Sequence, residues 1–435
     1  MAILLTGLIG WMVVNSTDAA ASGWSDLVPD ALSVPYQDNA YGYLRRAVAL
    51  LQWPHDRLGG EHFGEEWDDA VAGDILYRNS EVFSLAEQGL ACSAYRACDA
   101  SGSPAPQLES WDLLSVLLAQ KAAFEWRMGV RDAACEDSCG LLCLGLWITS
   151  HPRSLVEWQC GLMPVELGLE GIARRVHEPG LGEAELVALL DRLNRIDTLD
   201  RGLAEAFRRE FQDANQAIDV NTRRVPGRSL RAAYRFQPNR TRDVCASIYR
   251  RLIQNVPRVY AEVRLPQVPT LRMSGINHYL FLLRPNRQGK MITASFLRQA
   301  SADMCFANKC RIQSDLDGLR LVIACRLYEA RQGQRPEQLE ALVPEFLPRV
   351  PRDPFDGRPF RYVRERALVY SVGMDLKDPR GLGESPSAPM PVPRAPEPPD
   401  EQDWPEYSLP DRKPLLRRTQ YGTGDMVYRI FSETE

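Results

Sequence analysis

Side chains that could bind a metal ion gather in one short stretch of the sequence. His55 and His62 flank Gly59-Gly60-Glu61, and four more acidic residues follow by position 69. Two imidazoles and nearby carboxylates can ligate a divalent cation. His55, Glu61 and His62 are therefore candidate ligands of a metal-dependent hydrolase, although their spacing is not that of the HExxH motif. The alternative is an acidic loop leading into a helix, because acidic side chains are favoured in a helix's first turn.

Other catalytic signatures are missing from the sequence. It contains no GxSxG elbow, no P-loop and no GxGxxG fingerprint after a strand. The formal net charge of −5 also differs from the basic excess expected of a nucleic-acid-binding protein. These observations favour a non-enzymatic protein that does not bind nucleic acid.

The ten cysteines could bind a metal ion, form disulfides or pack as small apolar side chains. Cys135, Cys139 and Cys143 recur every four residues, which predicts that they share one face of a helix. They lack the paired CxxC turns of structural zinc sites, so we expect small buried hydrophobic groups instead. Cys92 with Cys98, and Cys305 with Cys310, are close enough in sequence to be candidate local disulfides in an exported protein.

The N-terminal residues suggest a route out of the cytoplasm. Ala2 to Val14 is almost wholly apolar, no charge precedes Asp18, and Ala19-Ala20-Ala21 is similar to a signal-peptide cleavage site. The run is shorter than the roughly 20 residues of a membrane span. Residues 1–21 are therefore interpreted as a signal peptide or as a truncated membrane anchor whose true start lies upstream. The remaining alternative is a buried N-terminal helix.

The rest of the chain divides by its hydrophobic pattern. Residues 36–220 have helical periodicity and short turns, which predicts a bundle or solenoid. Residues 221–290 are expected to be a loop-rich connection, and Met291 to Arg331 one long amphipathic helix ended by Gly333. Residues 384–420 are dense in Pro, which predicts an extended loop. The expected fold is mainly α, with a small antiparallel sheet near the C-terminus.

Two short segments within this pattern are similar to each other. RFQPNR, from Arg235 to Arg240, is similar to LRPNR, from Leu283 to Arg287, and each precedes a helical stretch. An Arg beside a helix N-terminus could hold an anion there. The alternative is that these are simply two similar entries into helices.

The C-terminal third carries a recognisable set of motifs. The helix end LVIACRLYEARQG is followed by VPRDPFDGRPFRY, from Val350 to Tyr362, and by YSVGMDLKD, from Tyr370 to Asp378. Together with the final strand near 425–429, these motifs resemble the C-terminal part of the major pseudopilin of type II secretion. The resemblance implies a pseudopilin-like module of helix and β-strands made of residues 291–383 and 421–431.

The resemblance also implies a metal ion. In that family the loop after the second strand, with an Asp just before the last strand, holds a structural calcium. Asp375, Asp378 and Asp425 are the matching positions in this chain. Carboxylates in such a loop suit a hard cation. Because Met374 and Leu376 replace small residues and a Pro-rich insertion precedes Asp425, a solvated loop without calcium is the alternative.

These observations lead to one expected function and one alternative. The chain lacks the basic leader and the early Glu with which pseudopilins begin, so we do not expect it to assemble as an ordinary pilin. We expect an exported or membrane-anchored scaffold of the bacterial cell envelope, located in the periplasm or on the outer face of the cytoplasmic membrane. Its partners would be envelope proteins of a type II secretion or pilus-like assembly, and the membrane through its N-terminus. The alternative is a periplasmic hydrolase that uses His55, Glu61 and His62.

Overall fold

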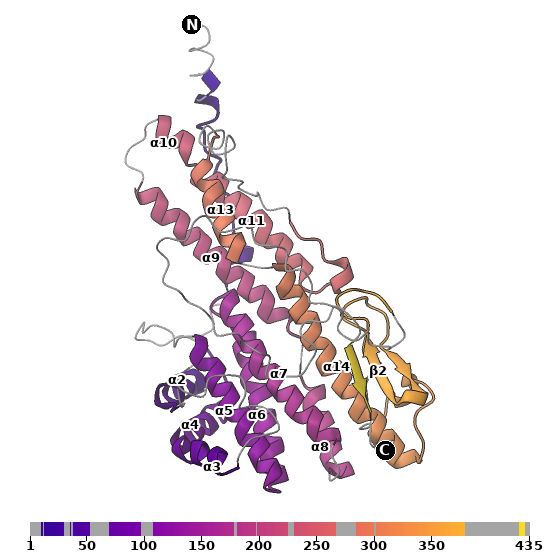
Figure 1. The fold of residues 1–435 in the computed structure, drawn as a ribbon. Helices are drawn as coiled ribbons and strands as arrows, with labels where there is room; N and C mark the ends of the chain where they lie inside the picture. Colours follow the sequence, from indigo (N-terminus) through magenta and orange to yellow (C-terminus); the bar gives the residue numbers. More distant parts are fainter. Residues whose placement is uncertain are drawn as a thin grey trace, which may run out of the picture.

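Figure 1 shows a computed structural model of the chain, in which helices predominate and a small sheet lies against one of them. The mainly α fold with a small antiparallel sheet is therefore confirmed. The structure describes residues 10–11, 13–29, 35, 38–52, 69–96, 108–177, 181–196, 198–224, 230–266, 284–299, 302–378 and 426–430.

The first group of helices encloses a core of its own. It comprises α2 (Ala40–Leu50), α3 (Asp69–Arg78), α4 (Ser80–Leu90), α5 (Leu108–Arg127) and α6 (Arg131–Ser150). Leu44, Leu114 and Leu144 are fully buried in this core. On α6, Leu144 faces these helices, whereas Leu142 belongs to the core on the other side. Helix α6 is thus a wall between two cores, which accounts for its nearly continuous apolar sequence.

The second core is larger and extends to the sheet. Its helices are α7 (Leu155–His177), α8 (Glu183–Asn194), α9 (Asp200–Arg224), α10 (Leu230–Arg235), α11 (Pro238–Asn255), α13 (Arg287–Gln299) and α14 (Ala302–Gln332). Trp158, Phe207 and Phe306 are fully buried within it. As Figure 1 shows, α9, α10, α11 and α13 extend beyond the first group of helices toward the N-terminal segment.

Two expectations about the middle of the chain are wrong. The region expected to be loop-rich contains α10 and the 18-residue helix α11. Pro238 is at the start of α11, where a backbone N–H would have no partner within the helix, so its absence costs nothing. This proline therefore marks the start of a helix rather than a break. The long helix expected from Met291 to Arg331 is two helices, because α13 packs on α9 and α11 whereas α14 packs on α7, α8 and the sheet.

The sheet has three antiparallel strands in the order β1-β2-β3: β1 (Arg361–Val363), β2 (Leu368–Ser371) and β3 (Met426–Arg429). Strands β2 and β3 pack on α14. The ring of Tyr428 lies directly over Gly318, where a Cβ would overlap it. Gly333 ends α14 with a φ of +69°, as the sequence predicted.

Helix α14 is buried on every face along its middle turns. Toward the helices, the Lys309 ammonium donates to Asp200 (3.0 Å) and to the Val256 carbonyl. Arg320 donates to the carbonyl oxygen of Leu193 (3.1 Å from Nε). Toward the sheet, the hydroxyl of Ser314 lies 3.3 Å from that of Ser371. The polar groups of α14 are therefore paired on both sides, so its burial leaves few of them unsatisfied.

No helix in the described part of the chain is both long enough and apolar enough to cross a membrane.

Helices α6 and α7 approach each other through glycines. A Cβ built on Gly168 would lie 2.7 Å from the backbone nitrogen of Leu142. On α3, by contrast, a Cβ on Gly73 would have no neighbour nearer than 3.9 Å. Both glycines lie inside helices, so replacing each by alanine changes helix propensity in the same way. A difference in stability between the two variants therefore reports the close packing at Gly168.

We expect Gly168→Ala to lower the free energy of unfolding by about 1–3 kcal/mol, because the added methyl forces the two helices apart. Gly73→Ala should raise it by about 0.5–1 kcal/mol, because alanine is the better helix former. Urea denaturation of both variants measures the difference. Equal effects at the two positions would contradict the close helix contact.

Candidate functional site

A network of charges holds the turn that resembles the pseudopilin motif. The carboxylate of Asp353, which is fully buried, accepts hydrogen bonds from the backbone of Phe355 and Val372 and from the Ser371 hydroxyl, each 2.9 Å long. The φ of +78° at Gly357 completes the turn, which packs against the end of β2. Burial raises the pKa of Asp353, and its hydrogen bonds with Phe355, Val372 and Ser371 oppose that effect. A cation also pairs with this carboxylate.

That cation is Arg361, at the start of β1. Its guanidinium donates to Asp353 (2.9 Å) and to Asp356, and its Nε lies 3.5 Å from Asp378. Burial works against the ionised form of Asp356. The hydrogen bonds from Arg361 and from the Arg358 backbone, together with the charges of both arginines, outweigh burial and lower the pKa of Asp356. One arginine thus joins three carboxylates from the turn and from the loop after β2.

The loop that would bind calcium is partly described. Asp378 accepts a hydrogen bond from the Tyr370 hydroxyl (3.0 Å) in addition to its contact with Arg361. Asp375 accepts from the Lys377 backbone (3.0 Å), and Asp425 lies outside the described residues. A calcium ion at this loop would compete with Arg361 for Asp378, so these residues fit the metal poorly. Calcium therefore stays a prediction, and we derive no step from it.

The remaining sequence candidates for a metal site are not brought together in the described residues. His55, Glu61 and His62 lie outside them, so the hydrolase hypothesis stays a prediction. His151 follows the end of α6 and His177 lies in the last turn of α7. Among the described residues, no group of three or more His, Cys, Asp or Glu side chains is arranged to hold a metal ion.

The cysteines follow the expectations only in part. Cys135 and Cys139 on α6 are half-buried, but Cys143 is exposed, so the prediction of three buried groups is wrong for Cys143. Cys305 and Cys310 are unbridged thiols within α14. Residues five apart in a helix point in different directions, which explains why the disulfide expected between them is absent. Cys98 is not described, so its expected bridge to Cys92 stays a prediction.

Residues 15–28, which we call the N-terminal arm, are docked on the helical body. The Asp18 carboxylate accepts hydrogen bonds from the backbone of Asn239 and Arg240, both 3.0 Å long. It therefore caps the N-terminus of α11 from more than two hundred residues away. Asp26 pairs with Arg250 (2.7 and 2.8 Å), and Leu27 is buried in the second core.

The arm answers a question that the sequence left open. The segment RFQPNR could hold an anion at its helix start, and the structure places the Asp18 carboxylate there. The similar segment LRPNR lies against the first, because the Asn286 side chain accepts a hydrogen bond from the Gln237 backbone (2.9 Å). Sequence reasoning missed the arm because its contacts are distant in the chain. The only signal was an acidic residue just after an apolar run.

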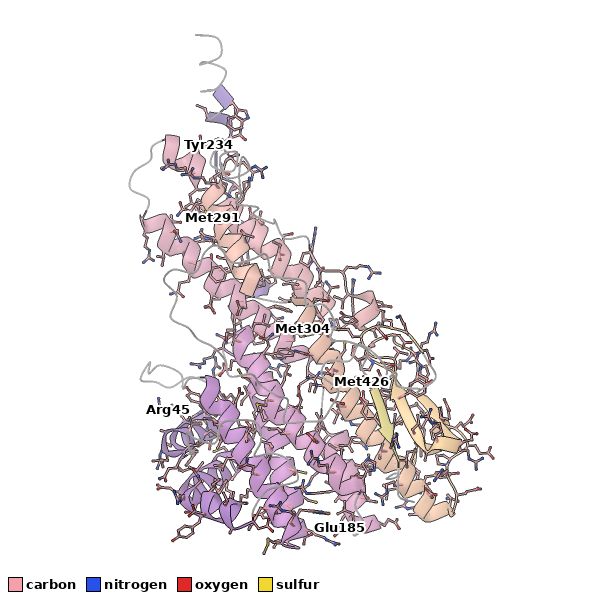
Figure 2. All side chains as sticks on the ribbon, in the orientation of Figure 1. Arg45, Glu185, Tyr234, Met291, Met304 and Met426 are labelled. Atoms are coloured by element: carbon pink, nitrogen blue, oxygen red, sulfur yellow. The ribbon has the colours of Figure 1, made fainter. Side chains whose placement is uncertain are left out.

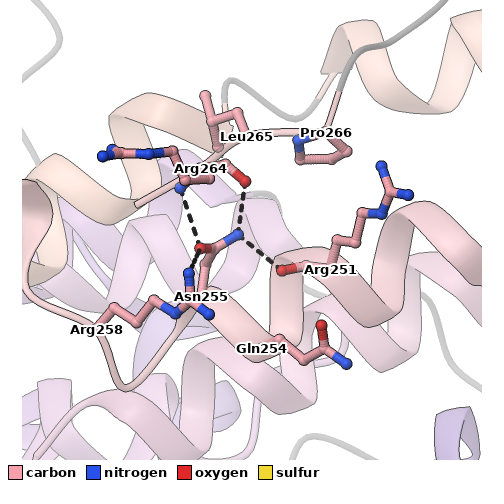
Figure 3. A pocket seen from close by; sticks show the side chains of 7 residues that line it. All are labelled: Arg251, Gln254, Asn255, Arg258, Arg264, Leu265 and Pro266. Carbon is pink, nitrogen blue, oxygen red and sulfur yellow. Dashed lines mark hydrogen bonds between the residues drawn. The ribbon is translucent and has the colours of Figure 1, made fainter. Parts of the chain in front are cut away.

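Figure 3 shows a shallow depression of about 300 Å³ beside the end of α11. Its lining is basic and comprises Arg251, Gln254, Asn255, Arg258, Arg264, Leu265 and Pro266. The Asn255 side chain is occupied, since it accepts from the Arg264 nitrogen (3.1 Å) and donates to the Arg264 oxygen (2.9 Å). The Arg251 and Arg264 side chains extend in different directions (Figure 3). The hydrogen bonds of Asn255 hold the loop that follows α11. The side chains that line the depression do not converge as catalytic groups would.

We expect Arg361→Gln to lower the free energy of unfolding by about 3 kcal/mol, because the buried Asp353 loses its counter-charge. Arg358→Gln is the matched control: its side chain is 79% exposed, so its effect should stay within about 0.5 kcal/mol. Urea denaturation with and without calcium measures both. Equal effects would contradict the role of Arg361, and a calcium-dependent gain in wild-type stability would instead support the calcium ligands.

Asp18→Ala removes the cap of α11 and should lower the free energy of unfolding by about 1 kcal/mol. Asp18→Asn keeps an acceptor and should retain most of the stability. Chemical denaturation gives the free energies, and limited proteolysis of the arm reports its release. An Asp18→Ala protein with wild-type stability and an equally protected arm would show that the cap contributes nothing.

Comparison with known proteins assigns no family to the chain. No family model matches it, and neither a curated protein nor a solved structure does. The resemblance to pseudopilins therefore rests on the sequence motifs between residues 321 and 378 and near 425–429 alone.

Proposed function

We propose that this protein is a non-enzymatic scaffold of the bacterial cell envelope. Its N-terminus anchors it to the outer face of the cytoplasmic membrane, and its pseudopilin-like module docks to a type II secretion or pilus-like assembly. The support comes from two features: the enclosure of α14 between the helical body and the sheet, and the docking of the N-terminal arm.

The enclosure of α14 is the observation that carries the proposal. A subunit that polymerises through its long helix needs a face of that helix for its neighbours in the fibre. Here α7 and α8 cover one side of α14, and β2 and β3 cover the other. The module is thus fixed to a helical body rather than available for polymerisation, and it presents its turn and strands as a docking surface.

The N-terminal arm supports a retained anchor over a cleaved signal peptide. Asp18 precedes Ala19-Ala20-Ala21, so cleavage after Ala21 would remove the carboxylate that caps α11. It would also remove the Ala19 carbonyl, to which the Asn239 side chain donates (3.0 Å). Contacts of this kind are expected of residues that remain in the mature protein. No described contact favours the alternative hydrolase.

Site-specific photo-crosslinking in intact cells tests the proposal. Arg358 lies on the turn of the module, and Tyr77 on α3 of the first group of helices, and both side chains are 79% exposed. A photoreactive residue at position 358 should capture a secretion or pilus component, identified by mass spectrometry, and the same residue at position 77 should not. Failure of position 358 to capture any envelope protein would contradict docking through the module.

A further inference from the structure

Large apolar side chains are exposed at the end of the molecule that carries the N-terminal segment. Trp11, Val13 and Val14 are 47%, 48% and 75% exposed. The Trp11 ring contacts the ring of Tyr234 on α10, with 5.5 Å between their centroids. Figure 2 labels Tyr234 and Met291 at this same end, and the Met291 side chain is 47% exposed.

Three cations lie together at the same end. Arg240 belongs to the first turn of α11, Lys290 to the first turn of α13, and Arg284 lies just before α13. The Asn286 side chain accepts from the Gln237 backbone (2.9 Å) and donates to the Thr241 hydroxyl (3.1 Å), so the starts of α11 and α13 lie against each other. Burial and the positive charges of Arg284 and Arg240 accordingly lower the pKa of Lys290. Within the described residues, none of the three forms an ion pair. The Asp18 carboxylate, which accepts from the backbone of Asn239 and Arg240, is engaged as the cap of α11.

The combination of exposed apolar groups and cations indicates what binds this end of the molecule. Tryptophan and tyrosine are favoured where a protein meets the headgroup region of a bilayer, and clustered Lys and Arg are attracted to anionic lipids. The sequence from Ala2 to Ile9 continues from Trp11 as an apolar run, which is suited to a bilayer rather than to water. An acidic protein partner would match the cations but would leave the exposed Trp11 and Val14 unexplained.

We propose that this end of the molecule rests on the membrane surface and binds anionic lipid headgroups through Arg240, Arg284 and Lys290. We call these three residues the basic end. The inference depends on the proposed membrane anchoring and adds to it an orientation and a lipid class. Since the net charge of the chain is −5, an anionic surface repels most of the protein and attracts this end. The module on α14 then stands away from the bilayer.

Co-flotation of the full chain with lipid vesicles tests the inference. Vesicles of phosphatidylcholine alone are compared with vesicles that also contain phosphatidylglycerol, at limiting lipid and at two salt concentrations. The wild-type protein should partition more strongly onto the anionic vesicles, and the preference should weaken with salt.

The variant Arg240→Gln/Arg284→Gln/Lys290→Gln removes the basic end. Its partition onto anionic vesicles should fall by about fivefold per cation, on the order of 100-fold in all, with no change on neutral vesicles. The matched control, Arg46→Gln/Arg78→Gln/Arg131→Gln, removes three cations from α2, α3 and α6 and should bind as the wild type does. A melting temperature equal to the wild type's verifies that each variant is folded.

The outcomes separate this inference from the proposed function. Equal partition of the wild type onto neutral and anionic vesicles, or equal loss in both triple variants, would overturn the role of the basic end and leave anchoring intact. Absence of binding to either vesicle would overturn membrane anchoring itself. Selective anionic binding, together with failed crosslinking at position 358, would support the basic end and overturn docking through the module.

Discussion

The enclosure of α14 determines how the other parts of the molecule are placed. The middle turns of this 31-residue helix are buried on every face, so their polar groups must be paired in every direction, since an unpaired one costs free energy. Arg320 meets this requirement at the C-terminal end of α8, where it donates to the carbonyls of Leu193 and Ile196. Lys309 does the same at the end of α11, through the carbonyl of Val256. Cations at helix C-termini also complement the helix dipole.

The same pairing fixes the sheet to the helical body. Tyr428 of β3 donates to Asp315 on α14 (3.2 Å), while Arg311, four residues earlier on α14, pairs with Glu166 of α7. The module is therefore oriented by contacts on both faces of one helix rather than by a linker. A rigid module suits the proposed scaffold, because a partner that bound it would have a defined orientation relative to the helical body.

The sequence allowed the elements to be predicted where a single local pattern decides them. Helical periodicity over residues 36–220 predicted a helical region, and a glycine predicted the end of α14. Predictions failed where the contacts that decide the structure are distant in the chain. Residues 221–290 were expected to be a loop-rich connection although they contain α11, and α13 and α14, expected as one helix, meet different neighbours.

The candidate site was less predictable than the fold for the same reason. Arg361 was visible only as one of many arginines, because its importance comes from three carboxylates that folding brings around it. The role of Asp18 depends on a helix start more than two hundred residues away. Neither interaction has a periodicity or a spacing that a single sequence could display.

Anchoring through the docked N-terminal arm is tested most directly by identifying the N-terminal peptide of the protein, isolated from the membrane fraction of the cells that make it. Mass spectrometry of that peptide shows whether the arm is retained. We expect a chain in which Asp18 is still joined to Ala19-Ala20-Ala21 and to the rest of the arm. A mature chain that begins after any of these alanines would lack the cap of α11 and would contradict anchoring through a docked N-terminal arm.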